Sequence, residues 1–398
     1  MAIKSSFPFL PENDLLTRWE NEIPCPDEPS YMLLMALCAV SSQTTAMNAV
    51  FDTTLLEGLA KHETGHQYYF AEAVSKVPAY IQPSQPQDHQ NLDQGQDLDY
   101  LRAFGLLAVY SLRSGNHIDL HRFLALYHAL VAQHSFHDES RWPTDLSLSD
   151  IDDWRRLFWC VYRLEIHSAC VLGHVVRMPE AQIFVLYPRI TPAMDVETRA
   201  WTAGWDYITD LFRLLEYAIF SLRGCKGENN RKASLAVLCE RPSPTTLLDS
   251  LERLKAGKPR ILIALGEGDL ARSNRCAYMD VQIVCTEALV SIMALLYCRA
   301  PAREVMDNAE AFLDEVTKAP LIMFKVASSH IVHQLLGVGH MLRNACKYDN
   351  GRYQAEAKRL ITFLVDLVKN LEHDIPSASD AGERLLLLAE ATSRTSPF

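Results

Sequence analysis

Apolar residues recur with the period of an α-helix along nearly the whole chain. In the segment 357–371, one helical face carries only aliphatic side chains: Leu360, Leu364, Leu367, Val368 and Leu371. A helix of this pattern buries one stripe against neighbouring helices. The chain shows no sustained alternation of apolar and polar residues, which a half-buried strand would need. Glycine, which tight β turns require, is scarce at 16 of 398 residues. The sequence therefore predicts an all-α fold.

The periodic segments predict where the helices lie. The predicted ranges are 30–47, 51–61, 66–77, 97–113, 117–136, 149–172, 195–224, 245–256, 260–266, 275–299, 301–318, 320–347, 352–373 and 380–392. Residues 81–96 are rich in proline, glutamine and aspartate and lack periodicity, so we expect a flexible loop there. We expect an N-terminal extension over 1–29, a single helical domain over 30–393, and a short tail over 394–398.

Composition and charge narrow the class of protein. Hydrophobic residues make up 48% and charged residues 22%, an ordinary composition for a globular protein. The net charge of −11 offers no electrostatic footprint for phosphate backbones, so direct nucleic-acid binding is not expected. No secretory leader and no uninterrupted apolar run of membrane-spanning length is found. Ten cysteines without a C-x-x-C pair are typical of reduced, buried thiols. We expect an intracellular protein, in the nucleus or cytoplasm, without a membrane anchor.

The run from Ser149 to Met178 is the most distinctive stretch of the chain. It opens with acids, which suit the positive end of a helix dipole, and Ser149 is the expected N-cap. Apolar residues follow at helical spacing, and Gly173 is the expected stop. The stretch therefore predicts a long, capped, amphipathic helix.

The same run resembles the hallmark of the fungal-specific transcription factor domain, also called the middle homology region of zinc-cluster regulators. The resemblance rests on Arg155, Arg156, Leu157, Phe158, Trp159, Tyr162 and Gly173. Glu165 stands where an aspartate is usual, and His174 and Val175 replace an Arg-Pro pair. The resemblance extends more loosely from about Tyr31 to about Ala300. It implies a helical bundle of irregular topology, in which Arg155, Arg156, Trp159, Tyr162, Glu165 and Gly173 are structural signature residues.

Regulators of this family usually carry a DNA-binding module in which six cysteines hold two zinc ions. Zinc needs closely spaced thiolates to complete its tetrahedral sites, but only Cys25 and Cys38 precede Cys160 here. We therefore expect these 398 residues not to contact DNA by the family's usual route.

One short motif suggests a metal. His62, Glu63 and His66 fit H-E-x-x-H, in which two imidazoles share a zinc ion on a helix and the glutamate activates water. No third ligand follows at a suitable spacing, and Thr64-Gly65 is expected to break the helix. We therefore favour a polar turn and expect neither a metal nor a cofactor.

Two further groups are candidate site residues. His330, His333 and His340 lie on an apolar helix beside Gly337 and Gly339, where imidazoles could act as acids or bases. Trp201, Trp205, Tyr207 and Tyr278 could wall an apolar ligand site. The competing interpretation in both cases is ordinary core packing.

Two functions follow from these observations. The first is a regulator of a fungal secondary-metabolite pathway that acts through a partner regulator or a small effector. The second is a cyclase or pericyclase that orients an apolar polyketide or terpenoid substrate inside the helical fold. The resemblance favours the regulator, although resemblance at the level of the fold does not determine function. The sequence leaves the oligomeric state open.

Overall fold

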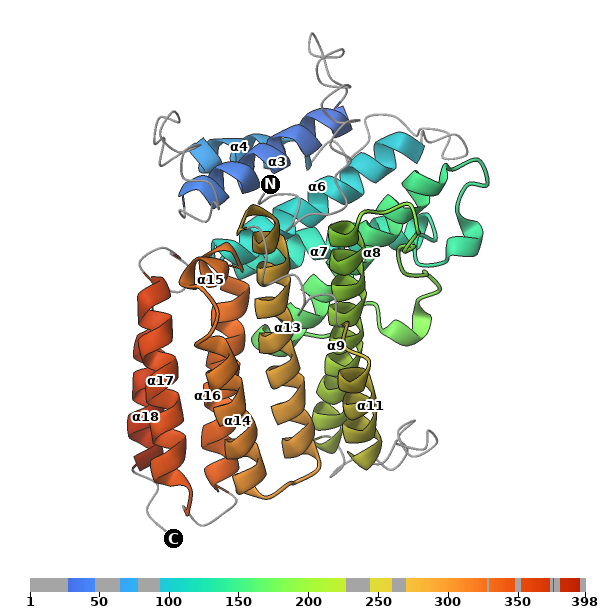
Figure 1. Cartoon of the computed structure of the whole chain (residues 1–398). Helices are drawn as coiled ribbons and strands as arrows, with labels where there is room; N and C mark the ends of the chain where they lie inside the picture. Colours follow the sequence, from blue (N-terminus) through green and yellow to red (C-terminus); the bar gives the residue numbers. More distant parts are fainter. Residues whose placement is uncertain are drawn as a thin grey trace. The chain divides into compact units, whose positions relative to one another are not determined.

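Most of the described part of the chain is helical. The structure, a computed structural model, describes residues 28–46, 65–77, 94–226, 244–259, 270–327, 329–347, 352–372, 375 and 380–393. Within these ranges the regular elements are α-helices and two short 3₁₀ turns (Figure 1). A single isolated parallel bridge, between Asp138 and Phe184, is the one piece of β pairing recorded there. The predicted all-α fold is confirmed.

The residue contacts divide the chain into two units. Unit 1 comprises residues 1–165 and 177–189, and unit 2 comprises residues 166–176 and 190–398. The division falls inside helix α8 (Leu148–Leu172). The predicted single domain over 30–393 stays a prediction.

The helices of unit 1 pack on one another around α3 (Glu28–Ala46) and α6 (Gln94–Arg113). The others are α4 (Gly65–Ser75), α7 (His117–Gln133) and the first part of α8. Helix α3 packs on α4 and α6, and α6 packs on α7. The 3₁₀ turns η2 (Glu139–Arg141) and η3 (Glu180–Gln182) lie in the segments before and after α8. Gly105 of α6 lets α8 approach closely, since a Cβ there would lie 3.2 Å from a methyl of Val161.

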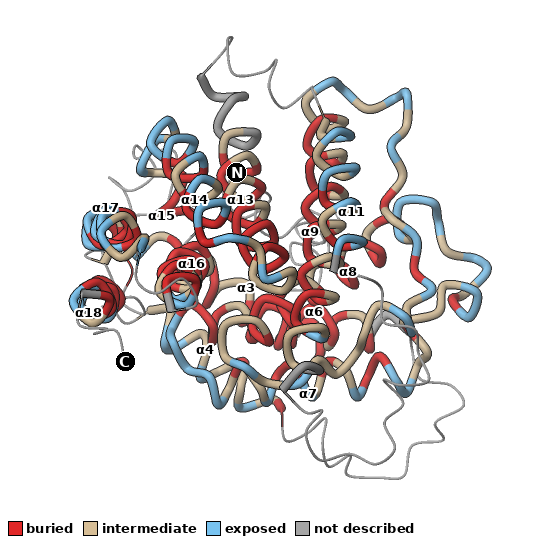
Figure 2. The backbone as a smooth tube through the Cα atoms, turned by 90° about the horizontal axis from the view of Figure 1, so that it is seen from below, coloured by how far each residue is buried: buried red, intermediate tan, exposed pale blue. Residues whose placement is uncertain are grey.

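Unit 2 is a helical bundle that contains the two longest described helices, α9 (Val196–Lys226) and α13 (Leu270–Tyr297). Its other helices are α11 (Pro244–Ala256), α14 (Ala302–Val316), α15 (Leu321–Ala327), α16 (Ser329–Lys347), α17 (Gln354–Glu372) and α18 (Ala381–Ser393). Helix α13 contacts α9, α11, α14, α15 and α16, and α16 contacts α17 and α18. Figure 2 shows that the buried residues of these helices face one another.

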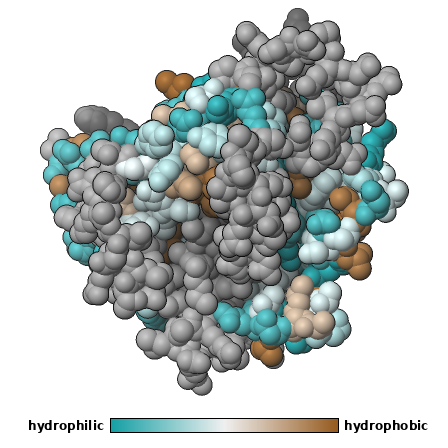
Figure 3. Space-filling model, turned by 90° about the horizontal axis from the view of Figure 1, so that it is seen from above, coloured by the Kyte–Doolittle hydropathy of each residue, from teal (hydrophilic) through white to brown (hydrophobic). Residues whose placement is uncertain are grey.

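Helix α13 explains the most apolar stretch of the sequence. Ala277–Tyr297 is long and apolar enough to cross a membrane, with a mean hydropathy of 1.7, and 67% of this stretch is buried within the structure. Since α13 packs on five other helices of unit 2, a core position accounts for its composition. On the face drawn in Figure 3, the described residues are mostly hydrophilic and the apolar ones form small separate groups.

Most predicted helices lie within a few residues of the observed ones, and two differences are informative. The predicted helix 320–347 is divided into α15 and α16. Helix α6 begins at Gln94, inside the predicted loop 81–96. The prediction missed this first turn because its residues are polar and show no apolar periodicity. The predicted helices 51–61 and 260–266, and residues 81–93 of the loop, lie outside the described residues.

Candidate functional site

The N-cap of helix α8 lies two residues before the predicted one. The Asp150 backbone N–H donates to Ser147 Oγ (3.2 Å), and the Ser147 N–H and hydroxyl donate to the Asp150 carboxylate (3.3 and 2.6 Å). This reciprocal pair is a capping box with aspartate in the third helical position. The prediction of Ser149 as the N-cap is therefore wrong, because Ser147 reaches the free N–H groups first.

Arg155 binds the segment that returns alongside α8. Its guanidinium pairs with both oxygens of Glu139, contacts Asp152 (3.4 Å), and donates to the Tyr187 carbonyl (3.3 Å). Asp152 in turn accepts from the backbone N–H and the guanidinium of Arg189 (3.1 and 3.0 Å). Because the Arg155 side chain is only 7% exposed, these partners replace the water it loses on folding.

Trp159 holds the same segment one turn further along. Its indole N–H donates to the Leu186 carbonyl (3.0 Å). Its ring packs edge-on against Tyr162 and Tyr187, with ring centres 5.2 and 5.1 Å away. Trp159 is buried, so the hydrogen bond satisfies a polar group that water does not reach.

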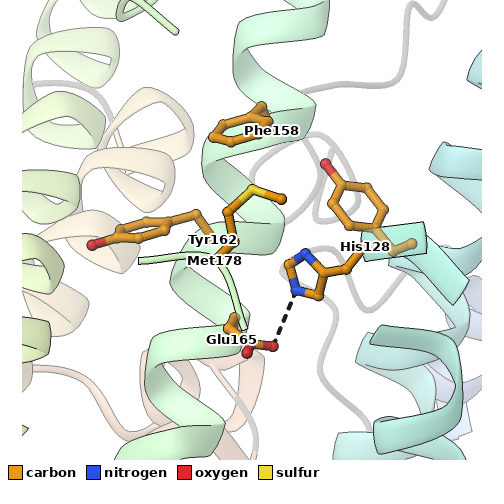
Figure 4. Close-up of a pocket in the computed structure, with 6 residues that line it drawn as sticks. His128, Phe158, Tyr162, Glu165 and Met178 are labelled. Atoms are coloured by element: carbon orange, nitrogen blue, oxygen red, sulfur yellow. Dashed lines mark hydrogen bonds and ion pairs between the residues drawn. The ribbon is translucent and has the colours of Figure 1, made fainter. Parts of the chain in front are cut away.

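Glu165 binds the start of the returning segment. Its carboxylate accepts the backbone N–H and the guanidinium of Arg177 (2.8 and 2.9 Å) and one ring nitrogen of His128, Nε2 (3.2 Å; Figure 4). Burial alone would raise the pKa of this carboxyl group, but the hydrogen bonds and charges of His128 and Arg177 outweigh it and lower the pKa. Glu165 is therefore ionised at neutral pH although its side chain is 1% exposed.

Together these contacts define a return segment, residues 177–189, which lies antiparallel to α8 within unit 1. Residues 152, 155, 159 and 165 of α8 hold residues 189, 187, 186 and 177 in that order. These α8 positions are spaced three to six residues apart and lie along one side of the helix. The signature residues Arg155, Trp159 and Glu165 thus hold backbone and side-chain groups of a segment that has almost no regular structure of its own.

The remaining signature residues also have structural contacts. Arg156 pairs with Asp153 (2.8 Å), and Tyr162 packs against Trp159. Gly173 follows the last residue of α8 with φ +78°, a left-handed conformation that glycine adopts at little cost. The predicted stop at Gly173 is confirmed. In unit 2, Arg223 donates to the carbonyls of Ala169, in the last turn of α8, and of His174, just after the helix (both 2.6 Å).

A small pocket lies beside the Glu165 cluster, within unit 1. It is lined by Tyr127, His128, Phe158, Tyr162, Glu165 and Met178, and Figure 4 shows how these side chains surround it. The volume that the centre of a water molecule can occupy in this pocket is about 10 Å³, which is close to the smallest volume that holds one water molecule. The pocket is therefore of the size of a single polar group, and a whole polyketide or terpenoid does not fit inside it.

The predicted histidine cluster forms only in part, and it gains a member from α8. The rings of His167 and His330 stack with their centres 3.6 Å apart, and His333 lies 6.0 Å from His167. Gln334 of α16 bridges His330 (3.4 Å) to Thr286 (3.2 Å). His340 is exposed and lies apart, because ten residues of helix rotate it away from His330. Parallel stacked imidazoles cannot both direct an in-plane lone pair at one ion.

His167 is the most constrained of these histidines. It is fully buried, and neither ring nitrogen has a hydrogen-bond partner among the described residues. Burial, together with His330 and His333, holds its pKa well below the ordinary value, so the ring is neutral. The glycines that were expected to leave room beside the histidines instead admit leucines: a Cβ on Gly339 would lie 2.5 Å from Leu385.

The four aromatic ligand candidates are core residues. Trp201, Trp205, Tyr207 and Tyr278 are each at most 4% exposed. They belong to α9 and α13, which pack on each other along unit 2. None of them lines the pocket beside Glu165. Their spacing is that of a buried helix face, so their role as a ligand site stays an untested prediction.

The metal motif is only partly described. His62 and Glu63 lie outside the described residues. His66, in the first turn of α4, contacts the Tyr110 hydroxyl (2.7 Å) through Nδ1. Among the described residues, no group of three or more histidine, cysteine, aspartate or glutamate side chains could hold a metal ion.

Residues 3–200 match the family described as the fungal specific transcription factor domain. The match includes α8, the return segment and the pocket. No curated protein and no solved structure matches the chain. The resemblance that rests on the Arg155–Trp159 run is therefore confirmed at the level of the family.

Proposed function

Since the chain carries a fungal specific transcription factor domain over residues 3–200, its role is transcription-regulator-like, and we propose that it regulates a secondary-metabolite pathway through a partner regulator or a small effector. The family match is the observation that carries this proposal. The net charge of −11 supports a partner as the source of the DNA contact. A domain of this family is typical of an intracellular protein, and we propose that this one acts in the nucleus.

The contacts of the signature residues agree with a binding domain. Arg155, Trp159 and Glu165 are each engaged by the return segment and are nearly buried. They stabilise a surface segment and leave no free nucleophile in that group. The cyclase or pericyclase alternative gains nothing from the family match or from the four aromatic candidates, which are buried in the core.

A gene deletion tests the proposal. Transcripts and metabolites are measured from the same culture of the deletion strain and of strains complemented with the wild-type gene or a Glu315→Ala control. Glu315 is exposed in a surface ion pair, so its removal should leave the fold intact. We expect transcripts of a group of biosynthetic genes to fall in the deletion strain and to recover in both complemented strains. Unchanged transcripts with one accumulating intermediate would instead identify an enzyme.

A further inference from the structure

Two buried polar atoms at the pocket beside Glu165 lack a hydrogen-bond partner among the described residues. Tyr127 Oη and His128 Nδ1 are both inaccessible to solvent, and neither forms a hydrogen bond with any described residue. Tyr127 is 1% exposed, and its ring centre lies 5.6 Å from that of His128. Burying an unsatisfied hydroxyl costs about 1–3 kcal/mol. Such a pair beside a pocket therefore points to an occupant.

The neighbouring groups determine what these two atoms can bind. Glu165 is ionised and only accepts hydrogen bonds, so His128 Nε2 carries the proton in their contact. In the neutral imidazole, Nδ1 is then an acceptor. Burial, with Cys160 adding to it, raises the pKa of the Tyr127 phenol, so this group keeps its proton and can both donate and accept.

A neutral hydroxyl group complements both atoms. It donates to His128 Nδ1 and accepts from Tyr127 Oη, whereas a carbonyl or an ether oxygen can only accept. A carboxylate would be repelled by Glu165, whose charge Arg177 already balances.

We propose that this pocket binds the hydroxyl end of a small alcohol or phenol. The space holds one oxygen atom, so the carbon part of the ligand lies toward the open side of the pocket. The site names a chemical class for a small effector. Ligand binding at this pocket can be tested whether or not the proposed regulatory role is correct, because binding is measured with the purified chain.

Calorimetric titration of the full chain with phenol and with anisole tests the site. Anisole has the same ring but cannot donate a hydrogen bond, so we expect phenol to bind the wild-type protein at least about 10-fold more tightly, as for one hydrogen bond. Tyr127→Phe removes the donor to the ligand oxygen, so it should weaken the binding of phenol and of anisole by a similar factor. Tyr207→Phe is the matched control: Tyr207 is a buried tyrosine of unit 2 whose hydroxyl also lacks a partner among the described residues.

Three results would overturn the proposal. They are equal affinities of the wild-type protein for phenol and anisole, an unchanged affinity of Tyr127→Phe for phenol, and the absence of saturable binding. The comparison of the two ligands on the wild-type protein needs no variant, so a folding defect in Tyr127→Phe would not obscure the answer. The binding test and the transcript test can fail separately. If the purified protein does not bind phenol but the deletion strain shows the expected fall in transcripts, only the binding site is wrong. If the protein binds phenol but the transcripts are unchanged, only the proposed regulatory function is wrong.

Discussion

Removing the Glu165 carboxylate should destabilise unit 1 more than removing any exposed acid. The carboxylate accepts three hydrogen bonds, two of them from Arg177 and one from His128. Its side chain is 1% exposed, while those of His128 and Arg177 are 11% and 24% exposed. Glu165→Ala would therefore leave a largely buried guanidinium and imidazole without their anion.

The magnitude follows from these contacts. Breaking a buried ion pair by removing one partner costs about 3–5 kcal/mol. Arg177 retains some access to water and recovers part of its hydration, so we expect about 3 kcal/mol for Glu165→Ala. Glu165→Gln keeps the volume and one acceptor oxygen for the Arg177 N–H but loses the charge, and should cost about 1.5–2 kcal/mol.

Equilibrium urea unfolding of the full chain, followed by circular dichroism, measures these differences. Glu315→Ala serves as the control, because the Lys318–Glu315 pair is 66% and 56% exposed and should contribute less than about 1 kcal/mol. A loss below about 1 kcal/mol for Glu165→Ala would refute the view that this carboxylate holds the return segment. A large loss for Glu165→Ala with almost no loss for Glu165→Gln would show that its charge is irrelevant.

Three other changes test separate features. Trp159→Phe removes the indole N–H and should lower the free energy of unfolding by about 1 kcal/mol. It should also speed tryptic cleavage within the return segment, measured by limited proteolysis. Unchanged cleavage would contradict the role of that contact. The depressed pKa of His167 means that the unfolded chain takes up a proton below about pH 6.5 while the folded chain does not, so stability should fall by up to about 1.4 kcal/mol per pH unit as the pH drops. Urea midpoints at pH 7.5 and 5.5 should show a smaller drop for His167→Phe than for the wild type or the exposed His117→Gln control, and equal drops would count against a neutral buried ring. Gly339→Ala places a Cβ 2.5 Å from an α18 leucine and should cost about 1–3 kcal/mol in thermal unfolding. Gly337→Ala leaves its Cβ 3.6 Å from the nearest atom and should be neutral or stabilising. Equal effects of the two variants would mean that α18 moves to accommodate the added methyl group at little cost.

Local patterns in the sequence predicted the helices well, because helix formation depends on residues close in sequence. The stop at Gly173 followed from the same kind of local rule, and its φ of +78° bears this out. The N-cap was misplaced by two residues, since Ser147 and Ser149 are equivalent by composition and only the reciprocal hydrogen bond with Asp150 distinguishes them.

The site was harder to predict, because its contacts join residues that are distant in sequence. The partners of Arg155 and Trp159 are backbone carbonyls of residues 187 and 186, which carry no side-chain signal. His167 was overlooked as a neighbour of His330 because the two lie on different helices. The sequence around Tyr127 and His128 is that of an ordinary amphipathic helix. Only the geometry shows that Tyr127 Oη and His128 Nδ1 have no hydrogen-bond partner in the part of the chain that the structure describes.

The order of contacts along the return segment also has a consequence for how the chain folds. The contact between Glu165 and Arg177 closes a loop of only 12 residues, and those at Leu186, Tyr187 and Arg189 span 27, 32 and 37 residues. Because the entropic cost of closure grows with loop length, the shortest loop should form first, beside the turn at Gly173. Each contact that forms shortens the loop that the next contact has to close, so the contacts can form one after another along the helix. Folding of this region should therefore start at the Glu165 end of α8 and proceed toward its N-terminus.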